Sequence, residues 1–390
     1  MKKALFTVAL LSVTLGASAQ GNNTGMGGND GNYQSLAERV TKIEKHNDMM
    51  NVYFNYAAAA HAQENDGTWQ SGFANKQLRL EIKGNLTDKL YYRLRHRLNK
   101  ATNAQGEDNF AKATDIMMVG YNVSDKMSVQ AGKMCQIWGG FEFDANPMYI
   151  YQYSDMVDNM DNFMAGVVVS YKPVPTQEIA VEVSDANNGK FADEYPGAAA
   201  QGIEASNNPL TYIVNWNGSM FDNMLQTRWS WGIQTQARHK YSGMIVFGQK
   251  LNLPTFQWYI DYMGAFDGLD RLKIASGELS SFMAPGQSYF SDVHYNSFIS
   301  KMEWQFAPQW NFFAKGMYET ASVSKMEKLK DYRKSYGYFA GVEYYPDKTQ
   351  DFRVSLTYIG RKYDYSNKCG LKDYNTNRVE LGFMYRIKCF

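Results

Sequence analysis

The chain has 390 residues, which is enough for one large barrel or for two to three ordinary domains. The formal net charge of +1 selects no class of partner by itself, and we expect no nucleic acid among the partners. Beyond the first twenty residues, no window offers the roughly 18 apolar residues that a membrane helix needs, which excludes a helical membrane protein. Aromatic residues nevertheless reach 15%, a content that suits membrane strands with a weak hydropathy signal.

The N-terminal 49 residues differ in composition from the rest of the chain. Residues 1–19 begin with MKK, continue with an apolar run and end with ASA, which predicts a secretory signal peptide that is removed. Residues 20–33 are rich in glycine and asparagine and are predicted to be a flexible tether. Residues 34–49 space their apolar positions four and three apart, which favours a periplasmic helix or a short coiled coil; an unordered spacer fits them equally well.

From residue 50 to residue 390, apolar and polar side chains alternate, which indicates extended strands. Short connections alternate with mostly longer ones, the longest at about 135–162 and 265–293. Short turns on one rim and long loops on the other are typical of an outer-membrane barrel. A soluble β-sandwich does not require short and long connections to alternate in this way. We therefore predict an all-β fold, a 16-stranded antiparallel transmembrane β-barrel. The predicted strands are 50–58, 73–84, 89–99, 111–122, 126–134, 163–172, 177–186, 209–217, 223–238, 241–252, 255–264, 294–306, 309–320, 335–345, 351–363 and 376–389.

The stretch LYYRLRHRL at residues 90–98 places Arg93, Arg95 and Arg97 on one strand face. Alternate side chains lie on opposite faces of a strand, so the guanidinium groups form a row about 7 Å apart. If the other face meets lipid, this row lies in a water-filled lumen and can guide anions. Further basic residues on the polar parity complete the predicted pore lining: Arg79, Lys83, Arg228 and Arg353. Alternatively, the arginines pair with lumen carboxylates and set only a transverse field, the candidates being Glu81, Glu178, Glu182, Glu303 and Glu319.

The loop at 135–162 is too long for a simple hairpin connection, and loops of this length are usually functional. Folded inward, it would be a constriction loop. Its acidic residues would repel phosphate unless the arginine row outweighs them; they are Glu142, Asp144, Asp155, Asp158 and Asp161. Alternatively, these acids bind Ca²⁺ or face outward, although the stretch DMVDNMDN lacks the glycine and the terminal glutamate of an EF-hand loop.

Several large aromatic residues fall on the apolar parity near strand ends, which predicts interfacial girdles rather than a sugar slide inside the lumen. They are Tyr92, Trp229, Trp231, Trp258, Trp304, Trp310 and Tyr385. The five histidines show no catalytic spacing, so we expect neither an enzyme nor a metal or other cofactor. The three cysteines are expected to be free thiols, with a Cys135–Cys369 bridge as the alternative.

The stretch SVQAGKMCQIWGGFEFDANPMYIYQYS, residues 128–154, resembles the fifth strand and the start of loop 3 in the phosphate-selective porins of the O and P type. The arginine strand and the N-terminal helical segment also fit, so the resemblance covers roughly residues 35–390. It implies a 16-stranded barrel, usually a homotrimer, in which loop 3 folds inward and arginines guide anions. Outer-membrane barrels commonly end in an aromatic assembly signal; here Phe390 shares the parity of Arg386 and Lys388, not that of the apolar set.

These observations predict a passive porin in the outer membrane of a Gram-negative bacterium, with a preference for anions such as phosphate. Its expected partners are small anionic or hydrophilic solutes, the lipid and lipopolysaccharide of the outer membrane, the outer-membrane assembly machinery and further copies of the chain. The alternative is a plugged surface barrel that acts as an adhesin or as a structural protein.

Overall fold

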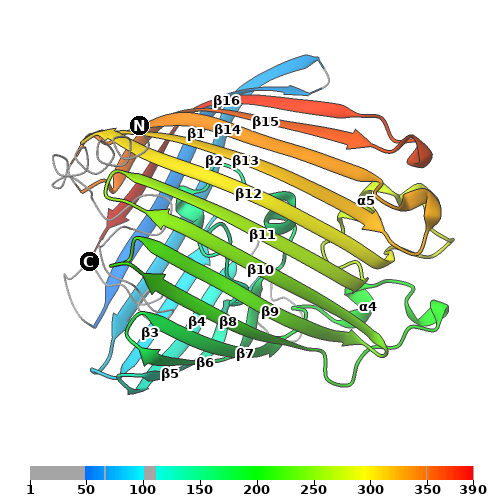
Figure 1. Ribbon diagram of the computed structural model, residues 1–390, viewed down its shortest axis with the longest axis horizontal. Helices are drawn as coiled ribbons and strands as arrows, with labels where there is room; N and C mark the ends of the chain where they lie inside the picture. Colours follow the sequence, from blue (N-terminus) through cyan, green and yellow to red (C-terminus); the bar gives the residue numbers. More distant parts are fainter. Residues whose placement is uncertain (1–48, 66, 101–110, 348, 390) are drawn as a thin grey trace, which may run out of the picture.

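The computed structural model describes residues 49–65, 67–100, 111–347 and 349–389, and here the chain forms a closed antiparallel barrel of sixteen strands (Figure 1). Each strand pairs with its neighbours in sequence, and β1 closes the barrel on β16. The strands are β1 (Asn51–Asn65), β2 (Thr68–Asn85), β3 (Leu90–Arg97), β4 (Thr114–Ser124), β5 (Met127–Cys135), β6 (Phe163–Val174), β7 (Gln177–Asp185), β8 (Leu210–Met220), β9 (Leu225–Ala237), β10 (Lys240–Asn252), β11 (Phe256–Leu269), β12 (Ser291–Ala307), β13 (Trp310–Val323), β14 (Arg333–Tyr344), β15 (Phe352–Tyr365) and β16 (Tyr374–Lys388).

All sixteen predicted strands are confirmed, together with the all-β barrel, but the first hairpin is longer than predicted. β1 continues to Asn65 and β2 begins at Thr68, so paired strands occupy most of the stretch 59–72 that was expected to connect them. The sequence there, AAAAHAQEN, has small and polar side chains with little period-two contrast; backbone pairing between the two strands extends them instead. The signal peptide, the tether, nearly all of the predicted helix and Phe390 lie outside the described residues.

The helical segments of the described chain are short and lie in the connections between strands. None of these helices is long and apolar enough to cross a membrane. The α-helices are α3 (Asp155–Asp158), α4 (Phe191–Glu194) and α5 (Ile274–Glu278), and the 3-10 turns are η2 (Pro147–Tyr149), η3 (Ala199–Gln201), η4 (Ser280–Phe282), η5 (Glu327–Leu329) and η6 (Asn367–Cys369). The three cysteines are free, so the alternative of a Cys135–Cys369 bridge is wrong.

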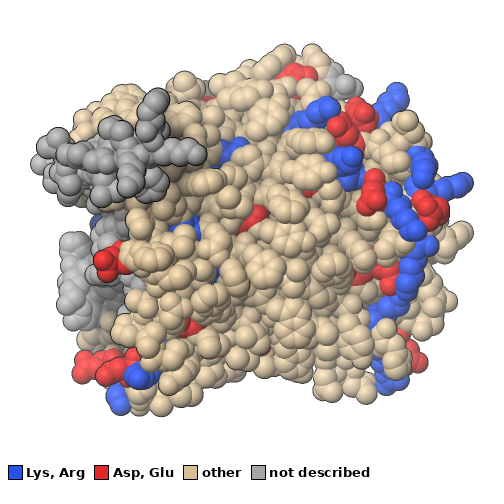
Figure 2. All heavy atoms as spheres, in the orientation of Figure 1, with Lys and Arg blue, Asp and Glu red and all other residues tan. Residues whose placement is uncertain are grey.

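The two faces of the sheet differ as the alternation predicts. On β9, Trp231 is 56% exposed on the outer face, whereas its neighbour Ser230 is buried inside the barrel. Figure 2 shows an outer wall with few charged side chains; most of the charged side chains lie at the rim where α4 and α5 lie, and a smaller group lies at the opposite rim. Most of the predicted girdle residues are exposed, namely Trp229, Trp231, Trp258, Trp304, Trp310 and Tyr385, while Tyr92 is half-buried.

The segment between β5 and β6, residues 136–162, folds into the barrel and packs against its inner wall; we call it loop 3. Its large apolar side chains are enclosed: Trp138, Phe141, Met148 and Met156 are at most 1% exposed. The wall has a glycine where the loop backbone comes closest. A Cβ atom at Gly248 of β10 would lie 3.0 Å from the Gly140 Cα atom and 2.7 Å from Asp261 Oδ1.

We expect Gly248→Ala to loosen loop 3, because the added methyl group displaces Asp261 or the loop backbone. Overpacking of this kind costs about 1–3 kcal/mol of folding free energy. The measurements are urea unfolding in detergent and proteolysis of the folded barrel, in which loop 3 should be cleaved faster. Gly316→Ala is the matched control, since a Cβ there meets no atom within 4 Å; equal behaviour of the two variants would contradict the expectation.

Candidate functional site

Carboxylates of the barrel wall hold the backbone of loop 3. Asp261 on β11 accepts hydrogen bonds from the backbone N–H groups of Phe141 (2.8 Å) and Glu142 (2.7 Å). Glu319 on β13 accepts one from the backbone N–H of Asp155 at 2.9 Å. Glu182 on β7 likewise accepts one from the backbone N–H of Ile137 at 2.7 Å. Two of the carboxylates that were candidates for pairing with the arginine row, Glu182 and Glu319, thus also anchor the loop.

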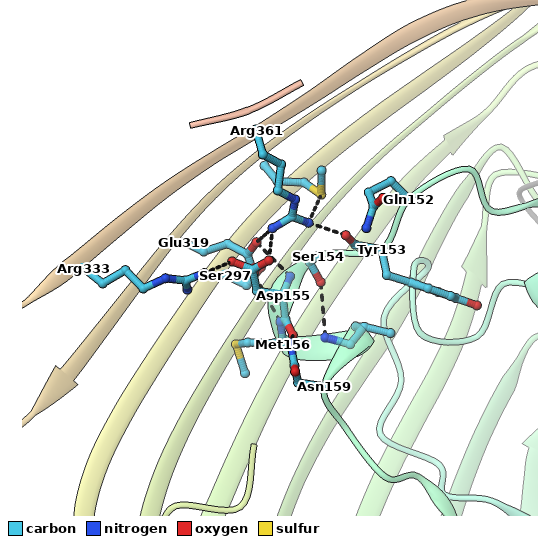
Figure 3. Close-up of polar contacts among 12 residues, drawn as sticks. Gln152, Tyr153, Ser154, Asp155, Met156, Asn159, Ser297, Glu319, Arg333 and Arg361 are labelled. Carbon is cyan, nitrogen blue, oxygen red and sulfur yellow. Dashed lines mark hydrogen bonds and ion pairs between the residues drawn. The ribbon is translucent and has the colours of Figure 1, made fainter. Parts of the chain in front are cut away.

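The acidic side chains of loop 3 are largely neutralised by basic residues of the wall. Glu142 forms an ion pair with Lys315 of β13, and both side chains are fully buried. Asp155, at the start of α3, bridges Arg333 and Arg361 of β14 and β15, as Figure 3 shows.

Loop 3 contains three further acidic residues. Asp144 pairs with Arg228 of β9, with 3.2 Å between Oδ2 and Nη1. Asp161 accepts a hydrogen bond from the Asn188 amide at 2.8 Å. The Asp158 carboxylate forms no hydrogen bond or ion pair with the residues that the structure describes. Burial raises the pKa of Asp158, and the nearby Glu142 adds to this rise.

The predicted arginine row lies inside the barrel, and the neighbouring strand extends it. In the register of β2 and β3, Arg79 lies opposite Arg97 and Lys83 lies opposite Arg93. Arg95 is 5% exposed, whereas Leu94, on the other face, is half-buried.

Two carboxylates partly neutralise this row. Glu81 of β2 lies 2.8 Å from Arg93 Nη2. Asp115 of β4 contacts three guanidinium groups, with distances of 2.6 Å to Arg97 Nε, 3.2 Å to Arg95 Nε and 3.9 Å to Arg79 Nη1. The carboxylates predicted from the strand pattern to pair with the arginines include Glu81 but not Asp115, because Asp115 lies on a strand that alternates poorly.

A cavity of about 880 Å³ separates the arginine row from loop 3. Among the described residues, ten basic side chains line it: Arg79, Lys83, Arg93, Arg95, Arg97, Lys100, Lys112, Arg228, Lys273 and Arg386. Four acidic side chains line it: Glu81, Asp144, Asp158 and Asp161. Since Glu81 and Asp144 each contact an arginine, the wall of this cavity carries a clear excess of positive charge. We call it the main cavity.

The main cavity contains most of the predicted basic residues, but not Arg353. That side chain is 1% exposed; its Nη1 lies 2.9 Å from Glu343, and its guanidinium group lies over the ring of Tyr149. Arg353 is on the predicted inner face, but loop 3 covers it. Sequence reasoning in turn overlooked four basic residues of this cavity, namely Lys100, Lys112, Lys273, which directly precedes α5, and Arg386 of β16. Of these, Arg386 shares the polar parity of its strand.

A second cavity, of about 360 Å³, lies on the other side of α3. Its wall includes Arg333, Arg361 and Arg378 together with three acids, Asp155, Asp158 and Glu278. Asp158 and Asn159 line both cavities, so the end of α3 separates them. Among the described residues, no group of three or more histidine, cysteine or acidic side chains could hold a metal ion.

Comparison with solved structures places this architecture among outer-membrane channels. The outer membrane channel DcaP of Acinetobacter baumannii aligns with a TM-score of 0.62 at 12% identity, over 87% of this chain and 97% of that one. An anion-selective porin from Comamonas acidovorans aligns with a TM-score of 0.55 at 8% identity, over 87% and 99%. OmpT of Vibrio cholerae, in its trimer form, aligns with a TM-score of 0.53 at 11% identity, over 87% and 100%.

No curated protein matches the chain. The family described as phosphate-selective porin O and P matches residues 29–387, which is nearly the whole chain and includes the arginine row, loop 3 and both cavities. This match confirms the resemblance seen in residues 128–154. The chain therefore belongs to the phosphate-selective porin O and P family, and it is a channel of the Gram-negative outer membrane.

Proposed function

We propose that this porin is a passive diffusion channel for small hydrophilic solutes with a preference for anions, phosphate included. The observation that carries the proposal is the charge of the main cavity, which has ten basic and four acidic side chains in its wall. A cavity of one dominant sign with low-dielectric walls concentrates counter-ions and speeds their entry.

The arrangement of the arginines suits transport rather than tight retention. Guanidinium groups offer forked donors that match phosphate or carboxylate oxygens. Arg93, Arg95 and Arg97 are two residues apart on β3, so an anion can exchange one set of hydrogen bonds for the next along the strand. Glu81 and Asp115 offset part of the positive charge, which keeps each step weak enough for release.

In the alternative hypothesis, the arginines only set a transverse electric field across the lumen. That hypothesis requires each arginine to be paired with a carboxylate. The contacts argue for partial pairing: Asp115 is shared by three arginines, and Glu81 contacts one. The acids of loop 3 that were expected to oppose anions are mostly occupied by wall cations instead. Arg353 is enclosed by Glu343 and Tyr149, so we leave it out of the proposed anion route. No catalytic step is part of this proposal.

We also propose that three copies associate in the membrane, in contact with lipid and lipopolysaccharide, after insertion by the outer-membrane assembly machinery. The trimer form of OmpT, which shares the fold, supports the first part. The largely uncharged outer wall seen in Figure 2 supports contact with lipid or with a second barrel. Phe390 remains the proposed assembly signal.

The triple variant Arg93→Gln/Arg95→Gln/Arg97→Gln should reduce the ratio of chloride to potassium permeability about tenfold, since it removes three of the charges that concentrate anions. The measurement is the reversal potential in planar bilayers under a salt gradient, repeated with phosphate. Arg238→Gln is the control, because Arg238 pairs with Glu204 on the exposed rim. A wild-type channel that prefers potassium would refute the anion preference, and the absence of any conductance would favour the plugged surface barrel.

Anion selectivity should rise as the pH is lowered from neutral. The pKa of Asp158 is raised, so this carboxyl takes up a proton at a higher pH than an ordinary aspartate, and the main cavity then loses a negative charge. Asp158→Asn should show the higher selectivity already at pH 7 and a weaker dependence on pH. Asp161→Asn, in the same loop, should keep the pH dependence; an unchanged response in Asp158→Asn would contradict the assignment.

A further inference from the structure

We propose that the second cavity binds zwitterionic solutes of amino-acid or dipeptide size. This goes beyond the anion preference assigned to the main cavity and concerns a second cavity, which shares only Asp158 and Asn159 with the main one. The cavity lies between α3 and α5 on one side and the inner faces of β14, β15 and β16 on the other. Its volume of about 360 Å³ falls within the range of small-molecule sites.

Most of the charges in this cavity already neutralise one another. Arg333 Nη2 lies 2.5 Å from Asp155, and Arg333 Nε lies 3.0 Å from Glu278. Arg361 pairs with Asp155 and also donates to the backbone carbonyl of Tyr153 (Figure 3). An ion that entered would have to separate these buried pairs, which is strongly unfavourable. This part of the wall is therefore a rigid, neutral frame.

Two groups of opposite charge, those of Arg378 and Asp158, can still form hydrogen bonds with a solute. The Arg378 guanidinium group contacts Glu380 through Nε at 2.8 Å and Gln152 through Nη2 at 3.2 Å. These contacts leave its Nη1 without a partner among the described residues. The Asp158 carboxylate likewise has no hydrogen bond or ion pair in the described part of the chain.

These two groups face the cavity from opposite walls. Arg378 belongs to β16 and Asp158 ends α3, and no ion pair joins them. A solute carboxylate can therefore accept hydrogen bonds from Arg378 while the ammonium group of the same solute donates to Asp158. A solute with only one charge engages only one of the two walls, so it gains fewer charge-assisted hydrogen bonds than a zwitterion. The geometry thus selects for both charges in one small molecule.

The rest of the lining keeps the cavity open and in a fixed shape. The rings of Tyr363 and Tyr374 stack with centroids 4.5 Å apart, and Arg333 lies over the Tyr363 ring at 4.9 Å. Tyr365 stacks on Tyr374 and donates a hydrogen bond to Glu278 at 3.0 Å. Because these contacts immobilise the aromatic wall before a solute arrives, little conformational entropy is lost on binding.

The test uses the full-length porin in planar bilayers and a charge-matched series of solutes. The series is alanylalanine, which is zwitterionic, its N-acetyl form, which is anionic, and its amide, which is cationic. We expect alanylalanine to interrupt the ionic current at the lowest concentration of the three. Arg378→Gln should raise the concentration for half-maximal interruption about tenfold, the effect of losing one charge-assisted hydrogen bond.

Arg97→Gln is the matched control, because Arg97 lines only the main cavity. It should lower anion selectivity and leave the response to alanylalanine unchanged. Arg378→Gln should instead leave anion selectivity unchanged and weaken the response to alanylalanine. Variants are compared only if they insert into the bilayer and form open channels, which shows that the barrel is assembled. The inference is overturned if Arg378→Gln leaves the dipeptide response unchanged, or if the N-acetyl form acts at an equal or lower concentration. The reversal potential from the same bilayers tests the anion preference separately.

Discussion

Closure of the hydrogen-bonded sheet is the constraint on which the rest of the structure depends. In hydrocarbon, each backbone N–H and C=O group needs an internal partner, and an open sheet edge leaves a row of them unpaired. Pairing of β1 with β16, from Tyr53 opposite Lys388 to Asn65 opposite Thr376, removes both edges. Once the sheet is closed, alternate side chains must lie either in lipid or in the lumen. The basic residues of β2 and β3 are thereby directed inward.

Within the lumen, the division of acidic residues explains how an acidic loop can coexist with a basic channel. Wall carboxylates such as Asp261 and Glu319 bind the backbone of loop 3, and the loop acids Glu142 and Asp155 bind wall cations. Both sets of acids are used to fix the loop in place. The cations on the opposite wall therefore face the solute with few carboxylates to oppose them.

The strands and the lumen position of the arginine row could be predicted because both follow from period-two alternation, which is local in sequence. Contacts between residues that are distant in sequence could not be predicted. Glu142 and Lys315 are separated by 173 positions, and no local pattern links them. Arg353 shows the same limit: its parity correctly predicts the inner face, but only the fold reveals that loop 3 covers it.

Asp115 was missed for a different reason. Opposite β3, Arg95 pairs with Ile116 and His96 pairs with Thr114, so Asp115 is an extra residue at a β-bulge. A bulge redirects a side chain that regular alternation would send to the other face. Asp115 is consequently turned inward, and it is 3% exposed.

That bulge has a consequence for how the channel responds to a passing ion. Asp115 does not line the main cavity, yet it contacts Arg79, Arg95 and Arg97 from behind. Three mutually repelling side chains are thus restrained by one carboxylate, and they need not rearrange when an anion arrives. The spacing of the charges that the ion meets is therefore set by a residue that the ion does not contact. Substitutions behind the lumen surface can thus change ion selectivity in this family, as substitutions on that surface can.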